Sequence, residues 1–294
     1  MVLDEERKAY RQSGCVLLNP NFKVENIKNL AEEVINSASN CEKVLETYER
    51  VKVLKNNEIY EKKVLTRLEN FICSNKRWRE LSQKIGSWVG HVCGGDDDND
   101  YGSNWCLYKE KLNLKPAGGT GYAPHLDNPS LMVTGLSSDF VTVMIAIDDM
   151  TIENGCLQII KGSWNEGNAL KYKTPVGDPD RDGRAGELEL GEQVDHDGAQ
   201  QGSERSHSSI LQWENCICSA GDVFIFNGWL PHRSGPNKTQ EARRAVFLTY
   251  NPPEDGDLRG LYYYLMKELR QDARKERVAQ SRDSNIDNAD TIIT

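Results

Sequence analysis

The hydrophobic pattern of the chain changes near residue 104, and this change limits the folds available to it. Apolar residues recur at helical spacing over 24–38, 56–75 and 77–92, so we predict a helix in each of these segments. The Gly- and Asp-rich run 94–104 then ends this part of the chain. From residue 105 onward, short apolar segments are separated by Gly, Pro and Asn, which is typical of strands joined by turns.

Five of these short segments are predicted to be strands, because β-branched and aromatic residues are concentrated in them. They cover residues 105–115, 140–150, 156–160, 222–232 and 243–251. Many short strands in one chain indicate a barrel or a jelly roll. We therefore predict a mainly β fold with flanking helices.

The length of 294 residues allows one large domain or two small ones, and single all-β domains reach this size. We therefore expect one domain over residues 1–294. Within it, residues 1–100 are predicted to be mainly helical and residues 104–255 to form the β core. A C-terminal helix and a charged tail are expected over residues 256–294.

One long segment interrupts the predicted core. Residues 165–211 are rich in Gly, Asp, Glu and Ser and show little periodicity, and a loop of this length is usually disordered or functional. We predict an insertion that acts as a lid. Its two histidines, His196 and His207, are either exposed loop residues or substrate contacts.

The composition argues against several kinds of partner. With a net charge of -9 and a pI near 5.2, the chain lacks the basic surface that nucleic acid or an anionic membrane requires. No signal peptide, apolar span or peroxisomal C-terminal signal is evident, and eight scattered cysteines are typical of reduced thiols. We therefore expect a cytoplasmic protein that acts on a small molecule and needs no obligate protein partner.

The run GYAPHLDNPS carries the first candidate metal ligands. Residues i and i+2 of a strand share one face, so His125 and Asp127 can reach the same ion. His232 ends a later strand and is the candidate third ligand. Two His and one carboxylate form the facial triad of non-haem Fe(II) oxygenases, which leaves other coordination positions open. The alternative is a loop histidine that is hydrogen-bonded to a nearby carboxylate.

A candidate anion site follows His232 in the sequence. Arg243 begins the strand RRAVFLTYN, and an arginine inside a barrel needs a carboxylate partner. Its planar guanidinium group can donate two hydrogen bonds to one carboxylate of a dicarboxylate cosubstrate, and the Ser234 hydroxyl can donate another. A surface role for Arg243 is the alternative, and its neighbour Arg244 is expected to have one.

These pieces together resemble a known family. The ordered motifs are KLNLKP, HLD, AIDDMTIENGCLQIIKGSW, SAGDVFIFNGWLPHRSG and RRAVFLTYN. From Tyr108 to Asn251, the insertion excepted, they resemble the phytanoyl-CoA dioxygenase-like (PhyH) branch of the Fe(II)- and 2-oxoglutarate-dependent oxygenases. One residue departs from the family pattern, because Trp164 stands where a histidine that is not a metal ligand is usual.

The resemblance implies a fold and a set of roles. The fold is a double-stranded β-helix, a cupin-like jelly roll, with helices on the N-terminal side. Fe(II) would be bound by His125, Asp127 and His232, which are therefore the catalytic residues, and O2 would react there. The cosubstrate 2-oxoglutarate would be bound at its distal carboxylate by Arg243 and Ser234. The further candidate cosubstrate contacts are Asn113, Lys111 and Lys109.

The substrate is a small polar metabolite in this interpretation. Tyr122, Asn128 and Trp229 flank the expected cavity and are candidate substrate contacts, while the nearby lysines hint at a carboxylated or phosphorylated compound. The family chemistry releases succinate and CO2 while a C–H bond of the substrate is oxidised. Hydroxylation is expected, and desaturation or oxidative cyclisation in a secondary-metabolite pathway is equally compatible with the sequence.

Two other functions stay open. One is a cupin-like metalloenzyme that does not use 2-oxoglutarate, and the other is a non-catalytic jelly-roll binding protein. Arg243 and Ser234, placed shortly after His232, favour the oxygenase over the first. The complete set of candidate ligands favours it over the second.

Overall fold

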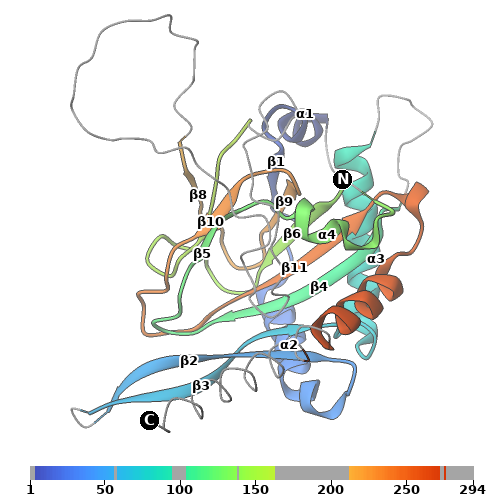
Figure 1. Ribbon diagram of the computed structural model, residues 1–294. Helices are drawn as coiled ribbons and strands as arrows, with labels where there is room; N and C mark the ends of the chain where they lie inside the picture. Colours follow the sequence, from blue (N-terminus) through green and yellow to red (C-terminus); the bar gives the residue numbers. More distant parts are fainter. Residues whose placement is uncertain are drawn as a thin grey trace, which may run out of the picture.

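Two antiparallel sheets face each other in the computed structural model, which describes residues 4–55, 58–94, 104–137, 139–162, 212–271 and 275 (Figure 1). The larger sheet has the order β1-β9-β6-β11-β4-β3-β2. Its strands are β1 (Cys15–Leu18), β9 (Val223–Asn227), β6 (Val141–Ala146), β11 (Arg243–Asn251), β4 (Cys106–Lys115), β3 (Glu58–Glu69) and β2 (Leu45–Lys55). The smaller sheet, β5-β10-β7-β8, contains β5 (Tyr122–His125), β10 (His232–Ser234), β7 (Leu157–Ile159) and β8 (Glu214–Cys216).

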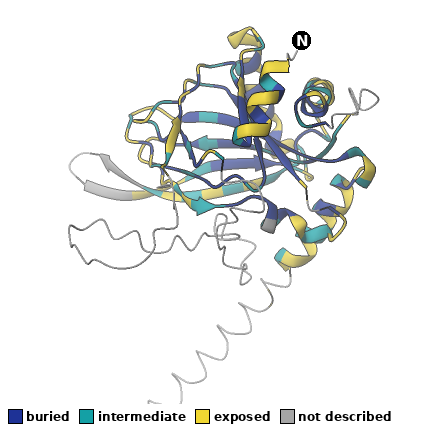
Figure 2. Cartoon of the chain, turned by 90° about the horizontal axis from the view of Figure 1, so that it is seen from above, coloured by how far each residue is buried: buried dark blue, intermediate teal, exposed yellow. Residues whose placement is uncertain are grey.

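Helices cover the outer side of the larger sheet. They are α1 (Asp4–Ser13), α2 (Val24–Ser37) and α3 (Lys76–Cys93). A C-terminal helix over 259–271 packs through Tyr262 against Tyr108 of β4, and the short turns are η1 (Ala38–Asn40), α4 (Asn128–Leu131), η2 (Met132–Thr134) and η4 (Pro253–Asp255). Figure 2 shows that the strands behind them are mostly buried, whereas the outward faces of α1 and of the C-terminal helix are exposed. The expected arrangement of helices beside a β core is present.

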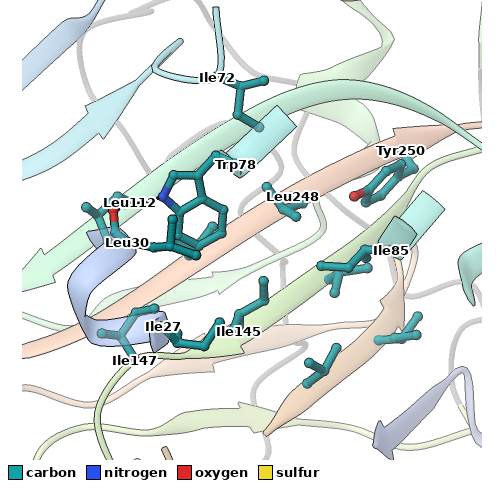
Figure 3. Packing of buried hydrophobic residues seen from close by; sticks show 14 of the residues in the cluster. Ile27, Leu30, Ile72, Trp78, Ile85, Leu112, Ile145, Ile147, Leu248 and Tyr250 are labelled. Atoms are coloured by element: carbon teal, nitrogen blue, oxygen red, sulfur yellow. Dashed lines mark hydrogen bonds between the residues drawn. The ribbon is translucent and has the colours of Figure 1, made fainter. Parts of the chain in front are cut away.

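The core between the helices and the larger sheet is built around Trp78. This indole is fully buried on α3, and its Nε1 donates a hydrogen bond of 3.0 Å to the carbonyl of Leu30 on α2. Leu112 and Leu248 of the sheet and Ile85 of α3 belong to the same cluster (Figure 3). Helices and sheet are therefore held together by one continuous apolar layer.

The other face of the larger sheet looks towards the smaller sheet. Along β11, Val246 and Leu248 belong to the helix-side core, while Ala245 and Phe247 pack with Leu157 and Ile159 of β7. This alternation follows from the two-residue period of a strand. A second core therefore lies between the two sheets, and the polar residues that share its face line a cavity.

The helix predicted over 56–75 is wrong. Residues 58–69 form β3, which pairs with β2 in a long hairpin and with β4 inside the sheet. The sequence misleads because Arg67 and Glu69 are buried on the cavity side, so the strand shows no alternation of apolar and polar residues. The spacing of Val64, Leu65 and Leu68 then imitates a helix.

Two other expectations lie outside the described residues. The predicted lid over 165–211, with His196 and His207, is one, and most of the tail after residue 271 is the other. Within the described parts of the chain, no helix is both long and apolar enough to cross a membrane.

The role of Trp78 can be tested by stability measurements. Replacing Trp78 by Ala removes a large buried side chain and should lower the free energy of unfolding by about 3–5 kcal/mol. Chemical denaturation measures this change. Tyr264→Ala is the matched control, because this aromatic side chain is 60% exposed and its loss should cost less than about 0.5 kcal/mol. Equal effects of the two substitutions would contradict the proposed core.

Candidate active site

Pairing of two short strands brings the three candidate metal ligands together. His125 ends β5, His232 begins β10, and the two residues lie opposite each other in the antiparallel register. Asp127 follows two residues after His125, immediately before α4. The side chains therefore come from both strands of one ladder and from the turn beside it.

The ligand atoms converge on one small volume. His125 Nε2 lies 3.9 Å from Asp127 Oδ1, and His232 Nε2 lies 3.6 Å from the same oxygen. The centroids of the two imidazole rings are 4.1 Å apart. One atom from each residue lies within 4.8 Å of the others, so a single metal ion can contact all three.

Hydrogen bonds orient each ligand towards that volume. The Nδ1 atom of His125 lies 2.8 Å from the carbonyl oxygen of Ala123, and that of His232 lies 2.9 Å from the carbonyl oxygen of Leu230. A carbonyl oxygen only accepts, so each Nδ1 carries the proton and each Nε2 presents a lone pair to a metal. Thr142 donates a hydrogen bond of 2.9 Å to Asp127 Oδ2, which leaves Oδ1 for the ion.

The protonation states also suit metal binding. Burial, together with the positive field of His232, lowers the pKa of His125 to about 3, so this ring is neutral near pH 7. Burial alone would raise the pKa of Asp127, but His232, Lys111, His125 and Thr142 outweigh it and hold the pKa below its usual value. A neutral imidazole and an ionised carboxylate are the forms that a divalent metal needs.

A close backbone contact fixes the turn that carries Asp127. The backbone N–H groups of Asp127 and Asn128 both donate to the carbonyl of Gly228, at 3.0 and 3.1 Å. A Cβ atom on Gly228 would lie 1.7 Å from Asn128 Oδ1, so no larger residue fits there without a shift. Asn128 is fully buried in this contact. It therefore helps to position Asp127, a candidate metal ligand, although we expected a substrate contact.

A cationic group lies at another part of the same cavity. Arg243 and Lys115 are paired across β11 and β4, and both are buried. Lys115 Nζ donates to Ser234 Oγ at 3.0 Å and to the carbonyl of Gly235 at 2.6 Å. Arg243 donates through Nη2 to the carbonyl of Gly155, while its buried Nε has no hydrogen-bond partner among the described residues. Buried polar atoms are normally satisfied, so this atom points to an absent anionic ligand.

The cavity has a polar and an apolar wall. Polar and charged residues along it include Lys111, Asn113, Lys115, Tyr122, His125, His232, Ser234 and Arg243. Met144, Leu157 and Phe247 contribute apolar side chains. The structure therefore brings most of the predicted metal and cosubstrate residues to one site.

The Arg67 side chain donates hydrogen bonds to two of the residues that line the cavity. Its Nε donates to Asn113 Oδ1 at 3.1 Å, and its Nη2 donates to the Tyr122 hydroxyl at 2.8 Å. Both side chains are thereby held at fixed positions along the cavity wall.

Three predicted residues do not line the described cavity. Lys109 forms an ion pair of 3.8 Å with Glu69 beyond the cavity wall. Asn128 supports the Asp127 turn, and Trp229 follows Gly228 in that same contact region, with its backbone N–H donating to Asn227 Oδ1. The roles assigned to these three residues remain predictions.

The sequence analysis missed Lys115, Arg67 and Thr142. A signal for Lys115 was present, because it continues the alternate positions of Lys109, Lys111 and Asn113 along β4. Arg67 was hidden by the mistaken helix. Thr142 lies in an otherwise apolar run and gave no signal of its own.

The fold and the site define a class of protein. A jelly roll that holds two histidines and one carboxylate on its inner face has the ligand set of non-haem metal-dependent oxygenases. The chain belongs to the phytanoyl-CoA dioxygenase (PhyH) family, whose model matches residues 10–245. The family predicted from the sequence motifs is therefore confirmed.

Relatives with assigned activities match part of the chain. It is 37% identical over 157 residues to the methylphosphonate hydroxylase of Gimesia maris, covering 53% of this chain and 49% of that protein. It is 30% identical over 202 residues to the 2-aminoethylphosphonate dioxygenase of an uncultured bacterium, covering 68% of this chain and 64% of that protein. The chain thus spans about half to two thirds of the length of these relatives.

Solved structures confirm the fold. The epimerase SnoN, determined with Fe3+, α-ketoglutarate and nogalamycin RO, has a TM-score of 0.55 and 18% identity, covering 85% of this chain and 83% of its own. EctD from S. alaskensis, determined with 2-oxoglutarate and 5-hydroxyectoine, has a TM-score of 0.58 and 16% identity, covering 86% of this chain and 77% of its own. The predicted jelly roll is therefore present.

Removal of one ligand tests the metal site. His232→Ala should weaken Fe(II) binding by more than about tenfold, since even changes in residues that merely orient a ligand cost about 10- to 100-fold. Anaerobic isothermal titration calorimetry measures the affinity. His91→Ala is the control, because His91 is exposed on α3. Unchanged iron affinity in His232→Ala would exclude His232 as a ligand.

Proposed function

We propose that this chain is an Fe(II)- and 2-oxoglutarate-dependent dioxygenase that oxidises a C–H bond of a small polar metabolite. One observation carries the proposal. His125 and His232, with Asp127 beside them, share a cavity with the buried Arg243, whose Nε has no hydrogen-bond partner in the part of the chain that the structure describes. A metal centre beside a site for a carboxylate matches the needs of this chemistry.

The donor set fits Fe(II). Nε2 of His125, Nε2 of His232 and Oδ1 of Asp127 would hold the ion and leave coordination positions for 2-oxoglutarate and O2. Iron and 2-oxoglutarate, when bound, supply oxidation of a substrate C–H bond with release of succinate and CO2. The protein contributes orientation of the ligands through Ala123, Leu230 and the other hydrogen-bond partners described above.

The cationic group suits the distal carboxylate of 2-oxoglutarate. Arg243 would donate its free Nε–H to that carboxylate, with the Ser234 hydroxyl beside it. Lys115 adds a second positive charge that the sequence analysis did not foresee. Asn113, two residues before Lys115 on the same face, would meet the end of the cosubstrate that chelates the metal. Met144 and Phe247 line the same cavity, and their apolar side chains would help to exclude water from it.

The names of two relatives support a small anionic substrate. Two of them are named for the oxidation of small phosphonates, which are polar and anionic. A small anionic metabolite agrees with the excess of basic side chains along this cavity. Hydroxylation is the proposed outcome, in line with the name of the Gimesia maris relative.

Anaerobic absorbance spectroscopy tests the proposal. Fe(II) and 2-oxoglutarate added together should produce the weak visible charge-transfer band of the chelate, and His125→Ala should abolish it. Folded, iron-loaded protein without this band would instead favour a metalloenzyme that does not use 2-oxoglutarate.

Substitutions can distinguish the role of Arg243 from that of its neighbour Arg244. Arg243→Met should raise the dissociation constant of 2-oxoglutarate by roughly 10- to 100-fold, the effect of losing one or two charge-assisted hydrogen bonds. Arg244→Met is the matched control, because the Arg244 side chain pairs with Asp148 instead. Calorimetry with the iron-loaded protein measures both. If the two variants bind 2-oxoglutarate equally well, another residue holds the distal carboxylate.

The affinity for 2-oxoglutarate should also depend on pH. Burial, with Arg243 nearby, lowers the pKa of Lys115 from 10.5 to about 7, while Cys156 and Glu49 oppose this shift. A bound carboxylate favours the ammonium form, so affinity should fall as the pH rises from 7 to 9. Lys115→Met should flatten this pH profile relative to the wild-type protein. If Lys115→Met keeps the wild-type pH profile, the titration of another group causes the pH dependence.

The lowered pKa of Lys115 should also make the free energy of unfolding increase with pH. Its folded pKa lies below its unfolded value, so the unfolded chain binds more protons between pH 7 and 10.5. The cost of burying the ammonium is therefore largest below pH 7 and disappears as the pH rises through this window.

A further inference from the structure

We propose that Lys111, supported by the charges of Arg67 and Lys109, binds a doubly charged oxyanion of the primary substrate, such as a phosphonate or phosphate group. This second anion site rests on the proposed function and names the substrate class of that same cavity. It is distinct from the site of Arg243 and Ser234.

The two cationic sites lie along one strand. Lys111 and Lys115 occupy the same face of β4, four residues apart, which corresponds to roughly 14 Å along a strand. Lys115 is opposite Arg243, whereas Lys111 is opposite Phe247. A five-carbon dicarboxylate spans only about 6 Å between its terminal carbons. The Cα atoms of the two lysines are therefore farther apart than the two ends of one 2-oxoglutarate molecule, which favours a separate anionic partner for Lys111.

The side chain of Lys111 is available for a ligand. It lines the cavity, and its Nζ lies 5.1 Å from the centroid of the Phe247 ring. Within the described residues, Lys111 makes no hydrogen bond or ion pair. Asp127 is the nearby carboxylate that favours its charge, and a metal ion would take up that negative charge. Metal binding would thus leave Glu69, opposite Lys111 in the β3–β4 ladder, as the remaining carboxylate that favours the charge of the ammonium group.

Other charges around Lys111 reinforce its need for an anion. Glu69, opposite Lys111 in the β3–β4 ladder, is buried and is approached by Arg67 at 3.5 Å, Lys109 at 3.8 Å and Arg270 at 3.9 Å. With Lys111, four cations lie around this one carboxylate, a formal excess of three positive charges once a metal ion has taken up the charge of Asp127. Charge of one sign is costly to bury without a partner. A dianion offsets most of this excess, and a single carboxylate offsets less.

The candidate site is close to the metal. Lys111 lines the same cavity as His125 and His232, and Asn113, two residues along the strand, lines it between Lys111 and Lys115. An oxyanion on Lys111 would therefore hold an adjacent C–H bond near the iron. This arrangement favours oxidation at a carbon close to the anionic group.

Binding of methylphosphonate tests the inference. The probe is titrated by anaerobic calorimetry into iron-loaded protein, with and without saturating 2-oxoglutarate. Lys111→Met should weaken binding of methylphosphonate by roughly 10- to 100-fold, the effect of a lost charge-assisted hydrogen bond, and should change 2-oxoglutarate affinity less than about threefold. Lys111→Arg should restore much of the affinity.

Two further variants test whether the effect is specific to Lys111 and whether the two anion sites are separate. Lys62→Met removes an exposed charge from β3 and should leave methylphosphonate binding unchanged. Arg243→Met should weaken 2-oxoglutarate and spare methylphosphonate. Methyl phosphate and propionate, titrated in parallel, distinguish a phosphonate site from a phosphate ester site and from a carboxylate site.

Several outcomes would overturn the inference. One is equal loss of 2-oxoglutarate and methylphosphonate affinity in Lys111→Met, which would make Lys111 a cosubstrate ligand. Another is wild-type protein that binds 2-oxoglutarate but neither dianion. If the wild-type protein binds methylphosphonate through Lys111 but never binds 2-oxoglutarate, the anion site stands and the proposed oxygenase function fails.

Discussion

The pairing of β10 with β5 is the contact on which the candidate site depends. It sets His232 opposite His125, and it also places Ser234 at the end of the cavity where Arg243 and Lys115 lie. β10 is only three residues long and pairs with β7 on its other side. A candidate metal ligand and a candidate cosubstrate contact are therefore two residues apart on one short central strand, and any displacement of that strand moves both.

A second constraint is the burial of charge between the two sheets. The inner face of β4 carries lysines where a jelly roll would ordinarily have apolar residues, and β3 adds Arg67 and Glu69. Apolar packing alone cannot account for these side chains, because a buried charge is stable only with a partner. In the proposed function, 2-oxoglutarate and the substrate anion would supply negative charge beside these cations, and the metal ion would be coordinated by His125, Asp127 and His232. The cavity is therefore understood best as a site that is electrostatically complete when its ligands are bound.

Much of the fold and of the metal site could be predicted from the sequence, for identifiable reasons. Strands such as β6 and β9 are continuous apolar runs bounded by turn residues, and His125, Asp127 and His232 occur in recognisable motifs. The β2–β3 hairpin could not be predicted, because pairing with β4 overrides local periodicity. Residues that orient others, such as Asn128, are identified only by contacts between distant segments. The roles of individual residues towards iron and 2-oxoglutarate remain predictions.

The alternation of side-chain directions along β4 limits how the sequence of this strand can change in evolution. Lys111, Asn113 and Lys115 face the cavity only because each is separated from the next by one residue that faces away. Insertion or deletion of a single residue within β4 would turn this row towards the helices and bring residues such as Leu112 to the cavity. New substrate preferences on this wall must therefore arise by exchange of side chains at every second position, whereas changes in length are confined to the connections between strands.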